Sequence, residues 1–210
     1  MVRNFITLLL CFLLGACSLL IVEDEVLFVD SFSDNRFFGD TRNPHGSVLV
    51  ADGVLKITVE QPNGMMVSLR PTELQDVIVA VNGWPQTAGE TVFFGIACRF
   101  VDNANFVYFS LGSNGDATIT KVDDGKVNIL AATKPDAPIG SNYGGRINHI
   151  SGQCNGTELS FSVNGIQALK ATDVSPQLGR FGIFASSQYA PRTVFFDDLT
   201  VSLPAIRVQP

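Results

Sequence analysis

The fold of this 210-residue chain is decided by residues 91–112, which read TVFFGIACRFVDNANFVYFSLG. Two apolar runs, 91–101 and 105–111, flank a short polar turn, and apolar side chains recur in them at every second position. Because successive side chains of a β-strand point to opposite faces, this period predicts two antiparallel strands. On the more apolar face of the first strand we expect Val92, Phe94, Ile96, Cys98 and Phe100. On the second faces of the pair we expect aromatic and polar side chains, among them Phe93, Arg99, Phe106, Tyr108 and Ser110.

The same pattern continues through the rest of the chain. Short runs rich in Val, Ile, Phe and Thr are separated by Gly, Asn, Asp and Pro every 8–12 residues or so, which is typical of a sandwich or barrel. No segment has the sustained apolar period of a helix. The expected strands are 26–32, 47–51, 54–60, 65–70, 76–82, 91–101, 105–111, 116–122, 126–131, 145–154, 157–163, 166–171, 179–185 and 193–203. This number exceeds that of an immunoglobulin-like domain and predicts an all-β, antiparallel two-sheet jelly-roll sandwich.

Composition excludes two classes of protein. The chain is 46% apolar and only 16% charged, whereas disordered chains are poor in apolar residues and rich in charge. Its formal net charge is −6, its pI is about 4.8, and it contains no basic run. Such a chain is poorly suited to contact a phosphate backbone, so we expect no nucleic-acid partner.

The first residues predict export and attachment to a membrane. Arg3 precedes an apolar run at 5–22, which contains Leu14-Gly15-Ala16-Cys17 and is followed by acidic residues at 23–25. The tetrapeptide resembles the lipobox of bacterial lipoproteins, which implies cleavage before Cys17 and acylation of that cysteine. An uncleaved anchor is the alternative, because about 17–25 apolar residues can span a bilayer. Either outcome holds the domain outside a bacterial membrane, at the cell surface or the periplasmic face.

These features divide the chain into four parts. The expected parts are a signal peptide at 1–16, an acylated cysteine and tether at 17–25, the jelly-roll domain at 26–203 and a tail at 204–210. Cleavage removes Arg3, so the net charge of the mature chain becomes −7.

The domain retains two cysteines, Cys98 and Cys154. In an oxidising compartment two such cysteines predict one disulfide. Two buried free thiols are the alternative.

Several short motifs follow one another in a recognisable order. They are Asp30-Ser31-Phe32, Ala51-Asp52-Gly53-Val54-Leu55-Lys56-Ile57, Phe94-Gly95-Ile96-Ala97-Cys98-Arg99-Phe100, Asn105-Phe106-Val107-Tyr108-Phe109, Cys154-Asn155-Gly156-Thr157-Glu158-Leu159, Val163-Asn164-Gly165, Gly179-Arg180-Phe181-Gly182-Ile183 and Phe195-Phe196-Asp197-Asp198-Leu199-Thr200-Val201. In this order, residues 28–203 resemble the concanavalin A-like lectin/glucanase superfamily, especially its laminin-G-like and 3-keto-disaccharide hydrolase-type branch. The resemblance implies two curved antiparallel sheets with carbohydrate on the concave face or at its rim. It also strengthens the pairing of Cys98 with Cys154.

The sequence argues against catalysis. The glucanase branch places its carboxylates as Glu-x-Asp-x-Glu on one strand face, and this chain lacks that pattern. It also lacks a nucleophile elbow, a phosphate loop and a zinc-ligand spacing. The leading hypothesis is therefore non-catalytic binding of an extracellular glycan or glycosylated partner. A 3-keto-disaccharide-type hydrolase and a structural interaction module without a sugar ligand are the alternatives.

Sugar binding needs an aromatic platform and nearby polar groups, and three candidate sites in the sequence offer them. The first is Trp84, the single tryptophan, in the loop-like stretch at 82–85, although its ring could instead fold back onto the core. The other candidates are Tyr108 with Arg99 and Phe93, and Tyr143 in a glycine-rich loop. Their alternatives are ordinary packing beneath a loop and a plain connection between strands.

A structural calcium ion is the one cofactor that the sequence suggests. Calcium prefers carboxylate and carbonyl oxygens. Asp30 lies in the first expected strand, and Asp197 and Asp198 lie in the last. The first and last strands are often neighbours in the fold that the chain resembles, so Asp30 is expected to meet Asp197 or Asp198. The alternative is that Asp197 and Asp198 hydrogen-bond a neighbouring loop.

Overall fold

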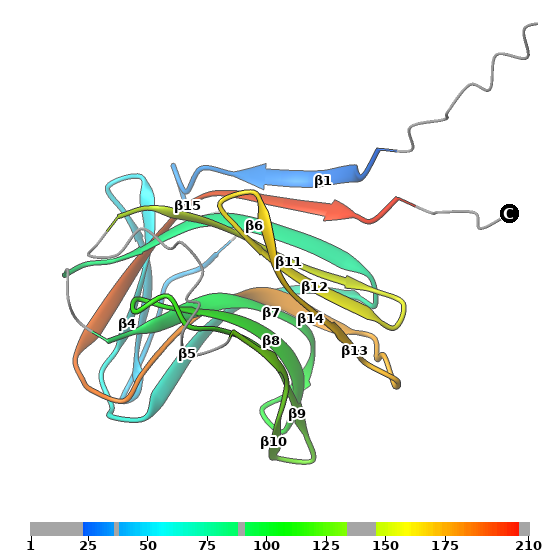
Figure 1. Ribbon diagram of the computed structural model, residues 1–210. Helices are drawn as coiled ribbons and strands as arrows, with labels where there is room; N and C mark the ends of the chain where they lie inside the picture. The colour runs from blue at the N-terminus through cyan, green and yellow to red at the C-terminus, as the bar shows by residue number, and fades with distance from the viewer. Residues whose placement is uncertain (1–22, 36–37, 88–90, 134–145, 206–210) are drawn as a thin grey trace, which may run out of the picture.

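The computed structural model describes residues 23–35, 38–87, 91–133 and 146–205. Within these ranges every regular element is a β-strand, and the strands form two antiparallel sheets packed face to face (Figure 1). The predicted all-β, two-sheet architecture is confirmed. The described ranges contain no helix of the length and apolarity that a membrane span requires.

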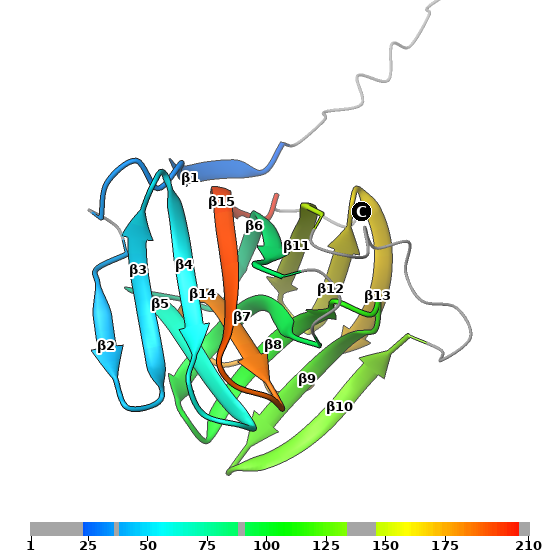
Figure 2. The ribbon, with the colours of Figure 1, turned by 90° about the vertical axis from the view of Figure 1, so that its left-hand side faces the viewer.

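The first sheet has nine strands in the order β13-β12-β11-β6-β15-β4-β3-β2, with β1 beside the second half of β15. Its strands are β1 (Glu25–Asp30), β2 (Thr41–Asn43), β3 (Gly46–Ala51), β4 (Val54–Val59), β6 (Val77–Pro85), β11 (Asn148–Asn155), β12 (Glu158–Val163), β13 (Ile166–Thr172) and β15 (Arg192–Leu203). Figure 2 shows β2, β3, β4 and the start of β15 side by side.

The second sheet has six strands in the order β10-β9-β8-β7-β14-β5. Its strands are β5 (Gly64–Leu74), β7 (Phe93–Asp102), β8 (Asn105–Gly112), β9 (Ala117–Asp123), β10 (Lys126–Ala132) and β14 (Gly179–Ser187). The sheet is curved, and its concave face points away from the nine-stranded sheet (Figure 1). The sandwich therefore has two outer faces, one concave and one on the nine-stranded sheet.

The core fills the space between the sheets and is built from the alternating apolar side chains. Phe94 of β7 meets Phe196 of β15 edge to face, with ring centroids 6.1 Å apart. Phe109 of β8 stacks on Phe161 of β12 at 5.8 Å. All four rings are at most 1% exposed. Because each buried aromatic ring removes a large apolar area from water, these contacts between sheets hold the two layers together.

All fourteen expected strands are present, with shifts of a few residues at their ends. The turns have the conformation that their residues predict, since Asp52-Gly53, Asp124-Gly125 and Asn164-Gly165 have positive φ. The short strand β2 was not expected. Trp84, expected in a loop, lies within β6, because the alternation of the strand continues through 82–85.

One sequence expectation about the faces is wrong. In β7 the alternation holds as far as Cys98, but Arg99 has a φ of +52° and the register with β8 shifts between Cys98 and Asp102. This bulge turns the next residue over, as β-bulges do. Phe100, expected in the core with Cys98, instead packs with Phe106 and Val122 in a separate cluster.

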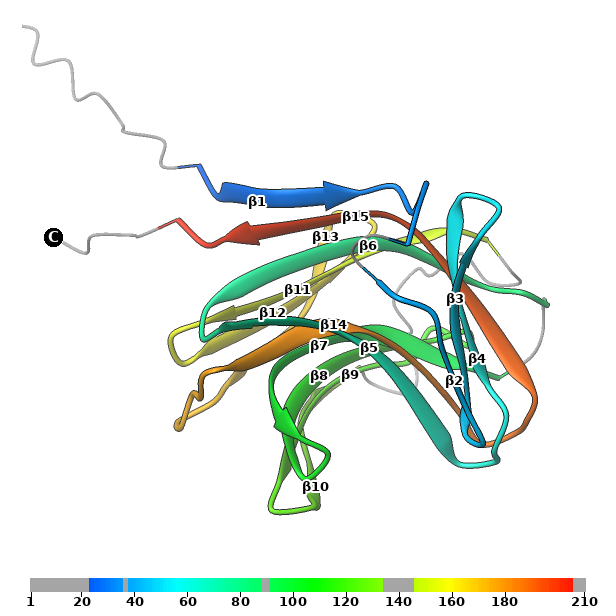
Figure 3. The same ribbon diagram turned by 180° about the vertical axis from the view of Figure 1, so that it is seen from behind.

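The ends of the domain are joined as expected. β1 pairs antiparallel with β15, and Asp30 is opposite Leu199 (Figure 3). Cys98 of β7 and Cys154 of β11 form a disulfide between the two sheets. The predicted pairing is confirmed.

Candidate functional site

The concave face of the six-stranded sheet carries a group of aromatic side chains that lie outside the main core. The strand alternation and the ring contacts place on it Phe93, Phe100, Phe106, Tyr108 and Phe184. We call this surface the aromatic face. Two of these residues, Phe93 and Tyr108, were predicted as ligand-binding residues, and the structure places both on one face.

Tyr108 has a fixed position near the middle of the aromatic face. Its ring lies 5.7 Å from that of Phe106 and meets the ring of Phe184 edge to face at 5.5 Å. These two neighbours are 9% and 1% exposed, while Tyr108 is half-buried. Because the buried neighbours constrain the tyrosine ring, a ligand that stacks on it meets a preformed surface.

A guanidinium group lies at one end of the aromatic face. Arg180 of β14 is the cross-strand partner of Phe100, and its Cζ lies 5.3 Å from the centroid of that ring. Both partners are held by this cation–π contact, since the guanidinium is attracted to the face of the ring. Arg180 was not predicted as a site residue. Alternation in 179–185 nevertheless places it on the other face of the strand from the core residues Phe181 and Ile183.

Hydroxyl groups continue the same face on β8 and β9. Ser110 lies two residues from Tyr108, and its Oγ is 2.8 Å from Thr118 Oγ1. Thr120, the cross-strand partner of Tyr108, donates to Thr118 at 3.2 Å. Ser110 and Thr120 are 5% and 1% exposed, so the half-buried Thr118 carries the hydroxyl nearest the surface of the aromatic face.

Carboxylates are confined to the margins of this sheet. The six strands contain Glu73, Asp102 and Asp123, each exposed and each at the last or next-to-last position of its strand. Asp102 accepts hydrogen bonds from Ala104 N and Asn105 Nδ2 within its own turn. Within these six strands, the central part of the aromatic face therefore presents aromatic rings rather than acids.

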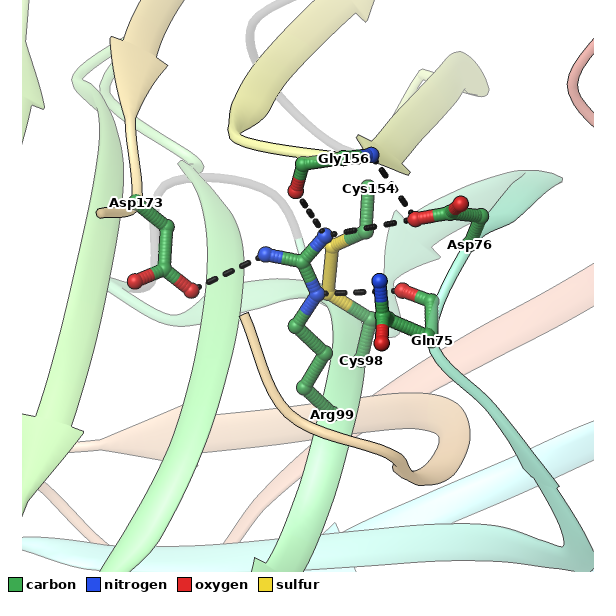
Figure 4. Close-up of a disulfide and its surroundings, with 7 residues drawn as sticks. All are labelled: Gln75, Asp76, Cys98, Arg99, Cys154, Gly156 and Asp173. Atoms are coloured by element: carbon green, nitrogen blue, oxygen red, sulfur yellow. Dashed lines mark hydrogen bonds and ion pairs between the residues drawn. A yellow bond between two sulfur atoms is a disulfide. The ribbon is translucent and has the colours of Figure 1, made fainter. Parts of the chain in front are cut away.

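Arg99 does not belong to the aromatic face, and its predicted ligand-binding role is corrected here. It is 2% exposed and lies at the end of the sandwich beside the disulfide (Figure 4). Its Nε donates to Gln75 O at 3.0 Å and its Nη2 to Gly156 O at 2.6 Å, and its Nη1 bonds Asp173. The bulge redirects the side chain toward turns of the opposite sheet, so Arg99 ties the layers together.

Asp173 completes this buried charge cluster. Its side chain is 1% exposed, and its Oδ1 accepts from Lys121 Nζ at 2.7 Å. Burial raises the pKa of the Asp173 carboxyl, but hydrogen bonds from Lys121, the Ser175 backbone and Arg99 outweigh it and hold the pKa below its usual value.

Trp84 lies on the other side of the molecule from Tyr108. It is half-buried on the outer face of the nine-stranded sheet, where its ring is 5.7 Å from that of Phe195. Gly83, the neighbouring residue, faces the core ring of Phe94. The predicted candidates Trp84 and Tyr108 therefore do not share a groove.

The residues expected to bind calcium lie on neighbouring strands, because Asp30 of β1 is opposite Leu199, the residue that follows Asp198 in β15. Asp30 is 8% exposed, and its Oδ1 accepts from Phe32 N. Asp198 is exposed and accepts from Asn82 Nδ2 at 3.0 Å, while its own N–H bonds Asp197 Oδ1. Across the described ranges, no group of three His, Cys, Asp or Glu side chains is placed to hold a metal ion.

A polar groove of about 640 Å³ lies beside β11, β12 and β13, next to both ends of the domain. Its described lining residues are Glu23, Asp24, Gln153, Asn155, Glu158, Leu159, Ser160, Gln167, Lys170, Ala171, Thr172 and Ala205. None of them is aromatic. Two predicted residues, Tyr143 and Cys17, lie outside the described residues.

Solved structures with the same two-sheet arrangement are similar to this chain. A carbohydrate-binding module of Bacillus subtilis, CBM66, matches with a TM-score of 0.61 at 15% identity, over 80% of this chain and 97% of the other. The fold is a concanavalin A-like jelly roll. A Bacillus licheniformis β-glucanase matches this jelly roll with a TM-score of 0.61 at 10% identity, over 86% and 98% of the two chains.

A third similar structure is the catalytic domain of an endo-1,3-β-glucanase (laminarinase) from Thermotoga petrophila. It has a TM-score of 0.61 at 12% identity and covers 89% of this chain and all of the other. No protein-family model matches the jelly roll, and no curated protein matches it in sequence. At these identities the likeness establishes the fold only.

Proposed function

We propose that this protein binds glycans at the aromatic face without catalysing a reaction on them. The observation that carries the proposal is the position of Tyr108, a half-buried ring held between Phe106 and Phe184, with the half-buried Thr118 on the neighbouring strand. The C–H faces of a pyranose pack on such a ring, while its hydroxyls need hydrogen-bonding partners. Structures of similar fold include a carbohydrate-binding module and glucanases, which supports a carbohydrate ligand.

Binding is favoured over hydrolysis by the distribution of acids. A glycosidase needs two carboxylates, about 5–5.5 Å apart in retaining enzymes and about 6.5–9.5 Å in inverting ones. Glu73, Asp102 and Asp123 instead lie at strand ends. A hydrolase of the 3-keto-disaccharide type is the competing function, and release of monosaccharide during incubation with a bound glycan would favour it.

We further propose that the domain is held outside a bacterial membrane through Cys17 or an uncleaved anchor. The apolar run at 5–22 and the Leu14–Cys17 tetrapeptide support this location. Such a location puts the domain where extracellular glycans are available. Mass spectrometry of the protein from its native membrane distinguishes an acylated Cys17 from a chain that still begins at Met1.

A glycan array followed by titration calorimetry tests the binding function. Tyr108→Ala should weaken binding of any array ligand by about tenfold, the loss of one stacking partner. Tyr189→Ala is the matched control, because Tyr189 is 58% exposed in the loop between β14 and β15. Absence of any sugar ligand at millimolar concentration would leave the structural interaction module as the better description.

A further inference from the structure

A second surface with suitable chemistry lies on the outer face of the nine-stranded sheet. Trp84 of β6, Phe195 of β15 and Lys56 of β4 are successive cross-strand partners in one row. The rings of Trp84 and Phe195 are 5.7 Å apart with an interplanar angle of 45°. Lys56 Nζ lies 5.8 Å from the centroid of the Phe195 ring. All three side chains are half-buried, and we call this row the Trp84 platform.

A row of hydrogen-bonding side chains runs beside the platform. Asn82 is on the same face of β6 as Trp84, and its cross-strand partners are His149 and Asp197. Asn82 Oδ1 is 3.0 Å from His149 Nδ1, and Asn82 Nδ2 donates to Asp198 Oδ2 at 3.0 Å. These contacts link three strands into one polar row.

The two rows are spaced for a sugar. Residues two apart on a strand are separated by about 7 Å, so a ring stacked on Trp84 has its edge near Asn82. A carboxylate offers about four acceptor positions, and Asp197 and Asp198 each make one described hydrogen bond. Hydroxyls at the edge of the ring thus meet acceptors, while its C–H face meets an aromatic side chain.

We infer that the Trp84 platform and its polar row form a second carbohydrate-binding surface, which takes a pyranose ring of a glycan. This surface is distinct from the site proposed at Tyr108, because the Trp84 platform and the aromatic face lie on opposite outer faces of the sandwich. The sheets stand about 10 Å apart, so one sugar ring cannot contact both. Each surface therefore binds independently, and one molecule can hold two glycan segments.

The chain carries its own reporter for this surface. Trp84 is the only tryptophan, so intrinsic tryptophan fluorescence senses the platform and not the aromatic face. The purified full-length protein is titrated with laminarihexaose, cellohexaose, xylohexaose and mannohexaose. At least one hexaose should shift the Trp84 emission and protect it from acrylamide quenching. If none does so at millimolar concentration, the inference is overturned.

A conservative variant tests the polar row while keeping the reporter. Asp198 has a φ of +51°, which asparagine also tolerates, so Asp198→Asn preserves the backbone. It should weaken the fluorescence-detected affinity by about fivefold, since a neutral acceptor forms weaker hydrogen bonds. Asp124→Asn, at a φ of +54° in the turn between β9 and β10, is the matched control and should change nothing. Equal hexaose affinities of the two variants would contradict a role for the polar row in binding.

The measurements distinguish a wrong assignment at Tyr108 from a wrong assignment at the Trp84 platform. If Tyr108→Ala abolishes calorimetric binding and Trp84 does not respond, the site at Tyr108 stands and the second surface is wrong. If the Trp84 response survives in Tyr108→Ala while the array and calorimetry show no other site, the second surface stands and the first is wrong. A Trp84→Ala variant that stays folded should lose one of two calorimetric events when both sites bind.

Discussion

Arg99 Nη1 and Asp173 Oδ2 are 2.9 Å apart, and these two oppositely charged side chains are only 2% and 1% exposed. They belong to opposite sheets, since Arg99 follows the disulfide cysteine of β7 and Asp173 follows β13. Lys121 also bonds Asp173, and Asp76 lies 3.6 Å from Arg99 Nη2. Because Arg99 Nη2 also donates to Gly156 O, Arg99 joins three segments distant in the sequence, at Asp76, Gly156 and Asp173, at one end of the sandwich.

Asp173→Asn should strongly destabilise the fold. The substitution removes the buried carboxylate next to Arg99 and leaves only the more distant, 40% exposed Asp76 beside it. Breaking a buried charge pair costs about 3–5 kcal/mol. Urea unfolding at neutral pH measures the free energy directly. Asp52→Asn is the control, because Asp52 pairs with Lys56 on the surface and its side chain is 83% exposed. The urea concentration at the midpoint of unfolding should scarcely change in this variant. Similar losses of unfolding free energy in both variants would show that the buried charge cluster stabilises the fold no more than a surface ion pair does.

The same carboxyl should make stability dependent on acid pH. The folded-state pKa of Asp173 is lower than its unfolded value, so the charged form is favoured by folding. Its contribution is complete above the usual pKa of about 4 and is lost as the pH falls through the folded value. Unfolding free energy measured between pH 7 and pH 2 should fall less steeply for Asp173→Asn than for the unsubstituted protein. Identical slopes would contradict the lowered pKa.

Loss of the disulfide should lower stability by a comparable amount. Cys98 and Cys154 are 56 residues apart, for which the chain-entropy model gives about 4 kcal/mol. We expect the double variant Cys98→Ser, Cys154→Ser to unfold at lower urea than the oxidised protein. Reduced wild-type protein should match the double variant, and a large difference between them would mean that serine disturbs the core.

Arg180 offers a test of the aromatic face that does not depend on removing a ring. Arg180→Lys keeps the charge but loses the planar group that stacks on Phe100. We expect glycan affinity to fall by about threefold to tenfold while thermal stability changes little. Lys126→Arg, at the start of the edge strand β10, is the complementary control. Unchanged affinity in Arg180→Lys would remove this residue from the site.

The strands were predictable because their signal is local. A period of two in runs such as 105–111, bounded by turn residues with positive φ, specifies a half-buried strand without any distant information. Cys98 and Cys154 were likewise recognisable as a pair from their number and expected compartment. Arg180 could have been found by applying the same alternation to 179–185.

The candidate site was harder to predict, because the side of the sheet on which a residue lies depends on unbroken alternation in the preceding part of its strand. The single positive φ at Arg99 reverses the alternation, which moves Phe100 outward and directs the Arg99 guanidinium toward Gly156 and Asp173 at the end of the sandwich. Nothing in the residue types marks that bulge, since arginine at positive φ is uncommon.

The β-strands, the tight turns and the two-sheet class could be read from the sequence, because they follow from short-range periodicity and backbone preference. The outer face that each candidate residue occupies became known only from the folded arrangement. Trp84 and Tyr108 lie on opposite sides of one sandwich because strand order places β6 and β8 in different sheets. That order is set by contacts between residues far apart in the chain, which no local pattern contains.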